Sequence, residues 1–320
     1  MTWTRKDLLT IRELERADIE LILETAREIK QRPSHLKDTP LAGRTVVNLF
    51  VEPSTRTRTS FELAARRLGA DVISIDSESS SFRKGETLKD TGLVLESMQA
   101  DFVILRHSAA GAPRFLAERL KAHLLNAGDG AHEHPTQALL DTFTMRERFG
   151  PDRSWESLHV VICGDILFSR VARSNVWALR KLGARVTLVG PSTLVPDVFR
   201  ELGVEVSHDF DSVLPDADVI MLLRIQHERQ RRSFFPSVGE YVSLFGLDLK
   251  RFHACKPDVL IMHPGPINRG VEIASELADC PNSTVLDQVH NGLVVRMAVL
   301  KLLNAVEGAP YRHDPGSIDS

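Results

Sequence analysis

The chain has 320 residues, of which 40 are Lys or Arg and 43 are Asp or Glu, so its formal net charge is −3. Hydrophobic residues make up 42% of the chain and charged residues 26%, which is typical of a soluble globular protein and excludes a disordered or fibrous one. This balance gives no overall attraction to nucleic acid or to anionic membranes, so any affinity for anions must be local. The length favours two domains, each with its own core.

The cysteines and the amino-terminal residues indicate a cytoplasmic protein. Cys163, Cys255 and Cys280 lie far apart and form no Cys-x-x-Cys pair, so we expect neither a disulfide framework nor a structural zinc site. The first residues are polar and lead into an amphipathic pattern rather than an apolar signal segment. No apolar run approaches the ~18 residues that a membrane-spanning helix requires, and we expect no membrane partner.

The first 150 residues predict a helix and then alternating strands and helices. Apolar residues recur at three- and four-residue steps from Leu8 to Ile29, which predicts an amphipathic helix. Strand–helix alternation is typical of βαβ units with parallel strands. The predicted strands are Thr45–Phe50, Asp71–Ile75, Phe102–Leu105 and Leu124–Asn126, and the predicted helices are Ser60–Leu68, Thr87–Glu96, Arg114–Lys121 and Pro135–Phe149.

The alternation begins again after the turn signal Gly150-Pro151-Asp152. We therefore predict an α/β protein of two doubly wound domains, residues 1–150 and 151–287, each with a parallel sheet flanked by helices. We place the active site in the cleft between them. A last helix, residues 288–306, is predicted to pack back on the first domain, and residues 307–320 form a tail. The second set of strands is Leu158–Cys163, Arg185–Val189, Val219–Leu223 and Val259–Met262, with a helix at Val171–Lys181.

Residues 50–62 carry the strongest chemical signal. They join a predicted strand to a predicted helix, where free backbone N–H groups and the positive end of the helix dipole meet an anion. Ser54, Thr55 and Thr57 add hydroxyl donors, and the forked guanidinium of Arg56 suits phosphate oxygens. The pattern is neither a P-loop nor a dinucleotide fingerprint. A helix cap followed by solvated arginines is the plainer alternative, which a run of consecutive donors makes less favourable.

This segment resembles the carbamoyl-phosphate motif of the transcarbamoylase family. Four further segments match the aspartate branch of that family: Ser80–Thr87, His134–Gln137, Arg224–Arg229 and His263–Pro266. The resemblance runs from about Thr45 to the final helix. It implies transfer of the carbamoyl group of carbamoyl phosphate to the amine of L-aspartate in pyrimidine synthesis. It also implies a homotrimer with active sites shared between subunits, and it leaves open whether a dihydroorotase or regulatory subunit associates.

For the carbamoyl half of the reaction, the resemblance implies that residues 54–57 bind phosphate. It also implies that Arg106 bridges phosphate and carbonyl oxygen, and that Gln137 orients the carbamoyl NH₂. His134 precedes Pro135, which suits a first helical turn, and we expect a neutral imidazole that donates to the developing oxyanion. Without the family match, a surface arginine and a helix-capping histidine are the plainer interpretations. The predicted catalytic residues are Arg56, Thr57, Arg106 and His134.

For the aspartate half, the resemblance implies that Arg170 and Arg224 clamp the two carboxylates, with Gln226 beside them. Both arginines follow predicted strands, although either is also consistent with a surface or ion-paired arginine. Where the family often has a threonine, this chain has Val171, which removes one hydroxyl contact. In the family the bond between Gly265 and Pro266 is cis and presents carbonyls to the reactants. A bulkier apolar residue is common at the position of Gly265.

One polar loop is expected to act in the neighbouring subunit. By resemblance, Ser80 and Lys84 reach the adjacent active site, with Ser81 as an alternative to Ser80 because the surrounding serines blur the register. From sequence alone this loop is a mobile surface segment. Glu52 is expected to form domain-closing ion pairs with Arg170 and with Arg229.

The expected mechanism uses positioning and oxyanion stabilisation rather than a general base, and it needs no metal or organic cofactor. The nearest rival is the ornithine branch, which carries a His-Cys-Leu-Pro segment where this chain has His263-Pro264-Gly265-Pro266. A catalytically silent homologue is a second alternative, but it would be expected to have lost some of these motifs. A nucleic-acid binder is disfavoured because aromatic residues are 6% of the chain and no basic stripe is present.

Overall fold

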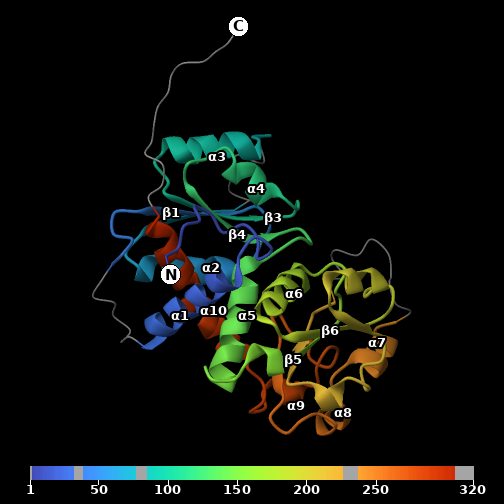
Figure 1. Ribbon diagram of the computed structural model, residues 1–320. Coiled ribbons are helices and arrows are strands. Elements are labelled where there is room, and N and C mark those ends of the chain that lie inside the picture. The colour runs from blue at the N-terminus through green and yellow to red at the C-terminus, as the bar shows by residue number, and fades with distance from the viewer. Residues whose placement is uncertain (1, 32–38, 77–84, 226–236, 307–320) are drawn as a thin grey trace.

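Two parallel sheets organise the chain, one in each half (Figure 1). The structure is a computed structural model that describes residues 2–31, 39–76, 85–225 and 237–306. All pairings between the strands named below are parallel. The predicted α/β architecture with two domains is confirmed.

The first sheet has the strand order β2-β1-β3-β4. The strands are β1 (Thr45–Phe50), β2 (Asp71–Asp76), β3 (Phe102–His107) and β4 (His123–Asp129), and the helices are α1 (Arg16–Gln31), α2 (Thr55–Arg67), α3 (Leu88–Ser97), α4 (Ala112–Ala117) and α5 (Pro135–Phe149). In β1, Val46 packs into one core and Val47 into another, so this central strand is buried on both faces. Burial on both faces explains why β1 and β3 read as mostly apolar runs, whereas edge strand β2 is partly exposed. Figure 1 shows α3 and α4 on one side of this sheet and α1 and α2 on the other.

The second sheet has the strand order β7-β6-β5-β8-β9. Its strands are β5 (His159–Cys163), β6 (Arg185–Val189), β7 (Glu205–Ser207), β8 (Val219–Leu222) and β9 (Leu260–Met262), and the helices of this half are α6 (Arg170–Leu182), α7 (Val238–Phe245), α8 (Leu249–His253) and α9 (Ser275–Ala278). Short 3₁₀ turns lie at Trp155–Ser157, Asp197–Leu202 and Leu214–Asp216.

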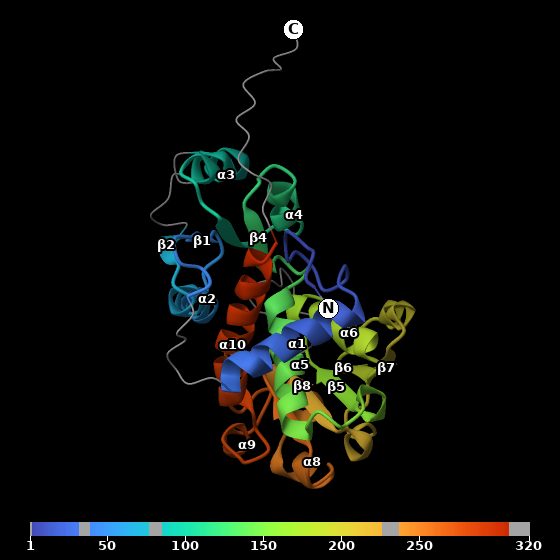
Figure 2. The same ribbon diagram turned by 60° about the vertical axis from the view of Figure 1, so that its left-hand side comes forward.

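The last helix, α10 (Val285–Asn304), contacts α1, α2 and α5 of the first half. Figure 2 shows α10 and α5 side by side with α1 crossing them. One of the hydrogen bonds that fix this packing joins the guanidinium of Arg296 in α10 to Ser60 Oγ in α2, at 2.9 Å. The last helix therefore returns to the first half and braces it.

The strand orders place the functional loops. In each sheet the order reverses direction at a neighbouring pair of strands, β1 and β3 in the first and β5 and β8 in the second. Ligands of open α/β sheets bind outside the carboxyl ends of the strands at such switch points. The four segments that leave these ends carry Ser54–Thr57, Arg106, Arg170 and Arg224.

Several predicted boundaries are wrong. The first helix begins at Arg16 rather than at Leu8, because Leu8 instead forms a parallel bridge with Leu125. The second begins at Thr55 rather than at Ser60, so the donor-rich segment is itself the first helical turn. Strand β7 and the short helices α7, α8 and α9 were not predicted, because three to eight residues are too few for a periodic signal.

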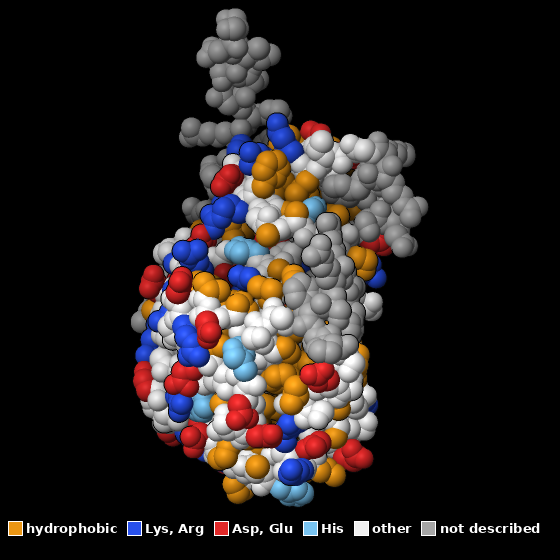
Figure 3. Space-filling model, turned by 90° about the vertical axis from the view of Figure 1, so that its right-hand side faces the viewer, with side chains coloured by type: hydrophobic (Ala, Val, Ile, Leu, Met, Phe, Trp, Pro, Cys, Tyr) orange, Lys and Arg blue, Asp and Glu red, His pale blue; other side chains and the backbone are white. Residues whose placement is uncertain are grey.

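The long helices and the charge distribution on one face complete the description of the fold. Within the described ranges, no helix combines the length and the apolar character that a bilayer crossing would need. On the face shown in Figure 3, acidic and basic side chains are interspersed over the second half of the molecule. Among the described side chains on that face, the basic ones form no continuous stripe of the kind that tracks a nucleic-acid backbone.

Candidate active site

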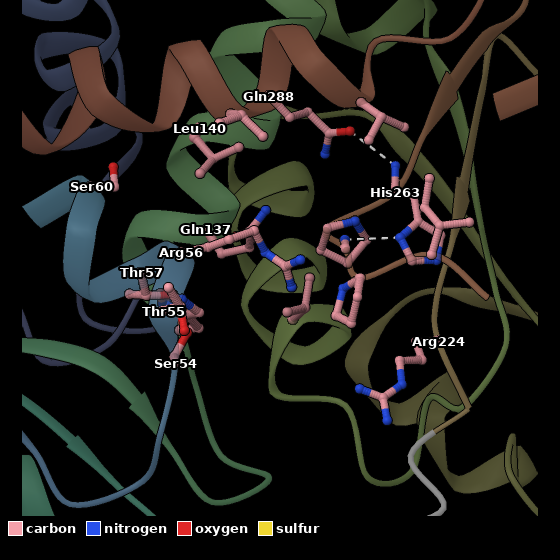
Figure 4. Close-up of a pocket in the computed structure, with 18 of the residues that line it drawn as sticks. Ser54, Thr55, Arg56, Thr57, Ser60, Gln137, Leu140, Arg224, His263 and Gln288 are labelled. Carbon is pink, nitrogen blue, oxygen red and sulfur yellow. Dashed lines mark hydrogen bonds between the residues drawn. The ribbon is translucent and has the colours of Figure 1, made fainter. Parts of the chain in front are cut away.

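A cavity of about 740 Å³ lies where the two domains meet, and both supply its walls. It collects eleven of the predicted site residues into one space: Ser54, Thr55, Arg56, Thr57, Arg106, His134, Gln137, Arg170, Arg224, Gly265 and Pro266. Figure 4 shows Ser54, Thr55 and Thr57 on one side and Arg224 on the other. The remaining predictions, Ser80, Lys84 and Gln226, lie outside the described residues, as do Ser81, Glu228 and Arg229.

The start of α2 forms one wall of the cavity. Ser54 is the residue before the helix, with extended backbone (φ −164°, ψ 100°), and its side chain makes no capping hydrogen bond to the helix. Its hydroxyl instead donates to Thr57 Oγ1 at 3.0 Å. The N–H groups of a first helical turn have no partner within the helix, and they carry the positive end of its dipole. An anion at this turn can therefore accept several hydrogen bonds from main chain and hydroxyls at once.

Glu52 joins two of the predicted cations. Arg106 Nη2 donates to Glu52 Oε1 at 2.8 Å, and Arg170 Nη1 donates to Glu52 Oε2 at 3.1 Å. Arg170 Nη2 also donates to Glu52 Oε1. The predicted pair of Glu52 with Arg170 is thus confirmed, whereas its pairing with Arg106 was not foreseen. One carboxylate offsets two buried guanidinium groups and connects the carboxyl end of β3 to the start of α6.

Gly128, at the carboxyl end of β4, lets these arginines come close. Its φ of +116° is unfavourable for other residues, and a Cβ there would lie 2.9 Å from Arg170 Nε and 3.0 Å from Arg106 Nη1. The nearby main chain also accepts from both, since Arg106 Nη1 donates to Ala127 O at 3.1 Å and Arg170 Nη1 to Gly130 O at 3.2 Å. A glycine is therefore required where the two cations meet.

His134 and Gln137 come from the start of α5. His134 is the residue before the helix and is buried, and its backbone N–H donates to Ser174 Oγ at 2.9 Å. Pro135 occupies the first helical position, as predicted. Gln137 lies one turn inside, and its Nε2 donates to Asp141 Oδ1 at 2.9 Å.

The opposite wall is formed by Arg224 and the loop after β9. The peptide bond between Gly265 and Pro266 is cis, as the resemblance implies. Gly265 has φ +63°, and a Cβ there would lie 3.3 Å from Arg56 Cζ, so the absence of a side chain leaves room for Arg56. Burial lowers the pKa of Arg56, and the charge of Arg224 lowers it further.

Burial, together with the same two cations, keeps His263 neutral. Burial, then Arg56 and Arg224, lower the pKa of His263 to about 4. The neutral ring accepts a hydrogen bond at Nδ1 from the N–H of Gly265, at 2.8 Å. His263 thereby fixes the turn that leads into the cis bond.

Three buried polar residues were not predicted: Gln288 and Arg296, which line the cavity, and Asp141, which is not among its lining residues. Burial lowers the pKa of Arg296 to about 10, and Asp141 raises it in part. The sequence feature that could have identified Gln288 and Arg296 is their position, because both are polar residues on the buried side of a mostly apolar helix. Among the described residues, no cluster of three or more His, Cys, Asp or Glu side chains is arranged to hold a metal ion.

Two family models match this chain. The model for the aspartate/ornithine carbamoyltransferase carbamoyl-P binding domain matches residues 6–147. The model for the aspartate/ornithine carbamoyltransferase Asp/Orn binding domain matches residues 156–303. The two matches cover the two sheets separately.

Individual relatives agree with this match. The chain is 59% identical over 304 residues to an aspartate carbamoyltransferase catalytic subunit from Opitutus terrae, covering 94% of this chain and 96% of the relative. Among solved structures, it is similar to aspartate transcarbamoylase from Trypanosoma cruzi in complex with carbamoyl phosphate and aspartate, with TM-score 0.84, 29% identity and coverage of 93% and 97%. It is also similar to ornithine carbamoyltransferase from Pyrococcus furiosus, with TM-score 0.82, 31% identity and coverage of 94% and 98%.

Proposed function

The chain belongs to the aspartate/ornithine carbamoyltransferase family, and on that premise we propose that it transfers the carbamoyl group of carbamoyl phosphate to the amine of L-aspartate. The products are N-carbamoyl-L-aspartate and phosphate, and the reaction serves pyrimidine biosynthesis. The proposal rests on one observation: a single cavity has an arginine on each of two facing walls, Arg56 at the start of α2 and Arg224 after β8. Such a site suits two anionic reactants held end to end.

In this proposal the first domain, residues 1–150, binds carbamoyl phosphate. The start of α2 binds its phosphate through the hydroxyls and N–H groups of Ser54, Thr55 and Thr57 and the guanidinium of Arg56. Arg106 bridges phosphate and carbonyl oxygen, sharing its guanidinium with Glu52. His134 donates to the carbonyl oxygen as negative charge develops there.

The second domain, residues 151–287, binds aspartate. The last helix packs back on the first domain, and it runs from Val285 to Asn304 rather than over the predicted residues 288–306. Arg224 binds one carboxylate of aspartate, with Gln226 beside it. Arg170 binds the other, although its bonds to Glu52 leave it less available than Arg224. The half-buried Val171 lines the cavity next to Arg170 without a hydroxyl.

The reaction is accelerated mainly because the cavity holds the two reactants in the orientation that the attack requires. Carbamoyl phosphate binds first and completes the aspartate pocket, after which the domains close. The neutral amine attacks the carbonyl carbon, the C–O bond to phosphate breaks in the tetrahedral intermediate, and the departing phosphate takes the amine proton. His134, Thr57 and Arg106 lower the barrier by holding the oxyanion, and the cavity walls supply the orientation.

We extend the proposal to a cytoplasmic homotrimer with Ser80 and Lys84 contributed by the neighbouring subunit. Support comes from apolar side chains at the cavity rim, because Leu286 and Val289 of α10 are 82% and 57% exposed. Edge strand β2 adds Ile73, which is half exposed. Apolar groups at such a place are typical of surfaces that a second subunit covers. A dihydroorotase or regulatory subunit is a further candidate partner.

Turnover with L-aspartate and L-ornithine tests the proposed substrate. With saturating carbamoyl phosphate, we expect kcat/KM for L-aspartate to exceed that for L-ornithine by at least about 10³-fold, because Arg224 pairs with a second carboxylate but repels a second amine. Formation of the N-carbamoyl product and release of phosphate are the two readouts. Preference for L-ornithine would place the chain in the other branch of the family, and turnover of neither would contradict catalysis.

A further inference from the structure

A buried carboxylate lies behind the cavity, where α5, α6 and α10 meet. Asp141 Oδ1 accepts hydrogen bonds from Gln137 Nε2 at 2.9 Å and from Gln288 Nε2 at 2.8 Å. Its Oδ2 accepts one from Asn175 Nδ2 at 2.8 Å. All four side chains are buried. Burying a carboxylate is costly unless donors compensate it, and here each of three helices supplies an amide donor.

An ionised carboxylate accepts hydrogen bonds but cannot donate them. Every amide that reaches Asp141 must therefore present its NH₂ end, which leaves the oxygen end for another partner. For Gln288 that partner is the backbone N–H of His263, at 2.9 Å (Figure 4). His263 Nδ1 in turn accepts the Gly265 N–H. A continuous line of hydrogen bonds thus runs from Asp141 to the loop that carries the cis bond.

The second amide, Gln137, lines the cavity as Gln288 does. With its NH₂ end held by Asp141, its oxygen is the end that remains for a ligand. A carbamoyl NH₂ group is a donor and requires an acceptor in this place. The orientation of Gln137 that Asp141 imposes is therefore the one that matches the carbamoyl group.

We propose that Asp141 is a positioning residue that sets the amide orientation of Gln137 and, through Gln288, the main chain of residues 263–266. The inference rests on the proposed function, because it takes the carbamoyl NH₂ as the partner of Gln137. Asp141 does not touch the reactants. It acts by making one of two nearly isosteric amide orientations the stable one at each glutamine.

The groups packed around Asp141 determine the pH at which its carboxyl becomes protonated. Arg296 of α10 is the charged group that acts on it, and Asn175 of α6 and Gln137 of its own helix are uncharged. Beyond Gln288 lies His263, which is neutral. Burial raises the pKa of Asp141, and its three amide donors and Arg296 lower it. The effect of burial is larger, and the resulting pKa is about 6. Below that pH the carboxyl is protonated and can itself donate, so an amide is free to turn its oxygen toward it.

Substitution of Asp141 by asparagine tests the proposal, since asparagine has the same shape but a donor on one side at every pH. For the wild-type enzyme we expect kcat at saturating substrates to fall as pH decreases through about 6. For Asp141→Asn we expect a kcat about 10-fold lower at pH 8 and no acid limb near pH 6, because the group that titrates is gone. The measurement is a pH profile of kcat for both proteins.

Asn291→Leu is the matched control. Asn291 lies one turn further along α10, is fully buried, and donates from Nδ2 to Thr144 Oγ1 of α5 at 3.0 Å. It therefore makes a comparable bond between the same two helices with no link to the cavity. We expect a lower Tm with wild-type kcat and a wild-type pH profile. Loss of kcat in both variants would mean that Asp141 acts only through helix packing, which would overturn the proposal.

Three outcomes separate the two hypotheses. A wild-type enzyme that does not carbamoylate L-aspartate contradicts the proposed function itself. The second outcome is an active wild-type enzyme together with an Asp141→Asn variant that keeps full kcat and the acid limb. This result overturns the role of Asp141 and leaves the proposed function standing. If Asp141→Asn is insoluble, Gln288→Met disrupts the same hydrogen bond by removing its donor. We then expect a kcat at least several-fold below that of Asn291→Leu, and equal kcat values would overturn the proposal.

Discussion

Replacing His134 by alanine is expected to lower kcat by about 10²–10³-fold, the usual loss when one oxyanion donor is removed. The side chain lines the cavity and is 4% exposed, and the backbone N–H of the same residue donates to Ser174 Oγ, which places the imidazole at the cavity before substrate arrives. Preorganisation of this kind raises kcat more than it strengthens ground-state binding. We therefore expect the KM for carbamoyl phosphate to change only a few-fold, as measured by steady-state kinetics.

His132→Ala is the control for that experiment. His132 lies two residues earlier and is substantially exposed, and its ring pairs with Asp129 at 2.9 Å. It does not line the described cavity. We expect its kcat to stay within about 2-fold of wild type, as for most surface substitutions. A similar kcat for the two variants, or a loss below a few-fold in His134→Ala, would remove the role of His134.

Replacing Arg224 by glutamine is expected to lower kcat/KM for L-aspartate by about 10²-fold or more, since truncating one partner of a buried charge pair costs about 2–5 kcal/mol. The loss should appear mainly in the KM for aspartate. Binding of carbamoyl phosphate should change little, because the proposed phosphate site at the start of α2 lies on the side of the cavity opposite Arg224. Steady-state kinetics with each substrate varied, and calorimetry with carbamoyl phosphate alone, separate the two effects.

Arg185→Gln is the matched control for Arg224→Gln. Arg185 lies on β6 of the same domain and pairs on the surface with Glu205 at 2.8 Å. Exposed pairs of this kind contribute little, so we expect wild-type constants for both substrates. Equal loss of carbamoyl phosphate and aspartate binding in Arg224→Gln would mean that Arg224 does not discriminate between the two halves of the cavity.

The positions of the site residues along the fold could be predicted because parallel strands constrain them. Arg106 and Arg224 end apolar runs or follow them directly, and Arg170 opens the helix after such a run, which is enough to place all three at a ligand-binding sheet edge. The helix start at Thr55 was misplaced because its donor-rich residues are poor helix formers taken alone. Their value as anion donors and their low helix propensity come from the same hydroxyl groups.

The links between these residues could not be predicted. Glu52 binds two arginines that lie 54 and 118 residues away in sequence. Asp141 and Gln288 are 147 residues apart, and nothing in local periodicity pairs them. A pattern shows that a position is buried, but the partner of a buried polar group is set by how the helices pack. For this reason most of the predicted site residues were found from sequence, and the buried side chains that pair with them were not.

A crystal structure with a bisubstrate phosphonate such as N-(phosphonacetyl)-L-aspartate tests the central claim most directly. The account predicts the phosphonate at the first turn of α2, within hydrogen-bond distance of Thr55 and Arg56, and a carboxylate on Arg224. It further predicts Ser80 and Lys84 of a neighbouring subunit at the same ligand. A ligand bound away from Thr55, or an Arg224 side chain turned to solvent in the complex, would contradict it.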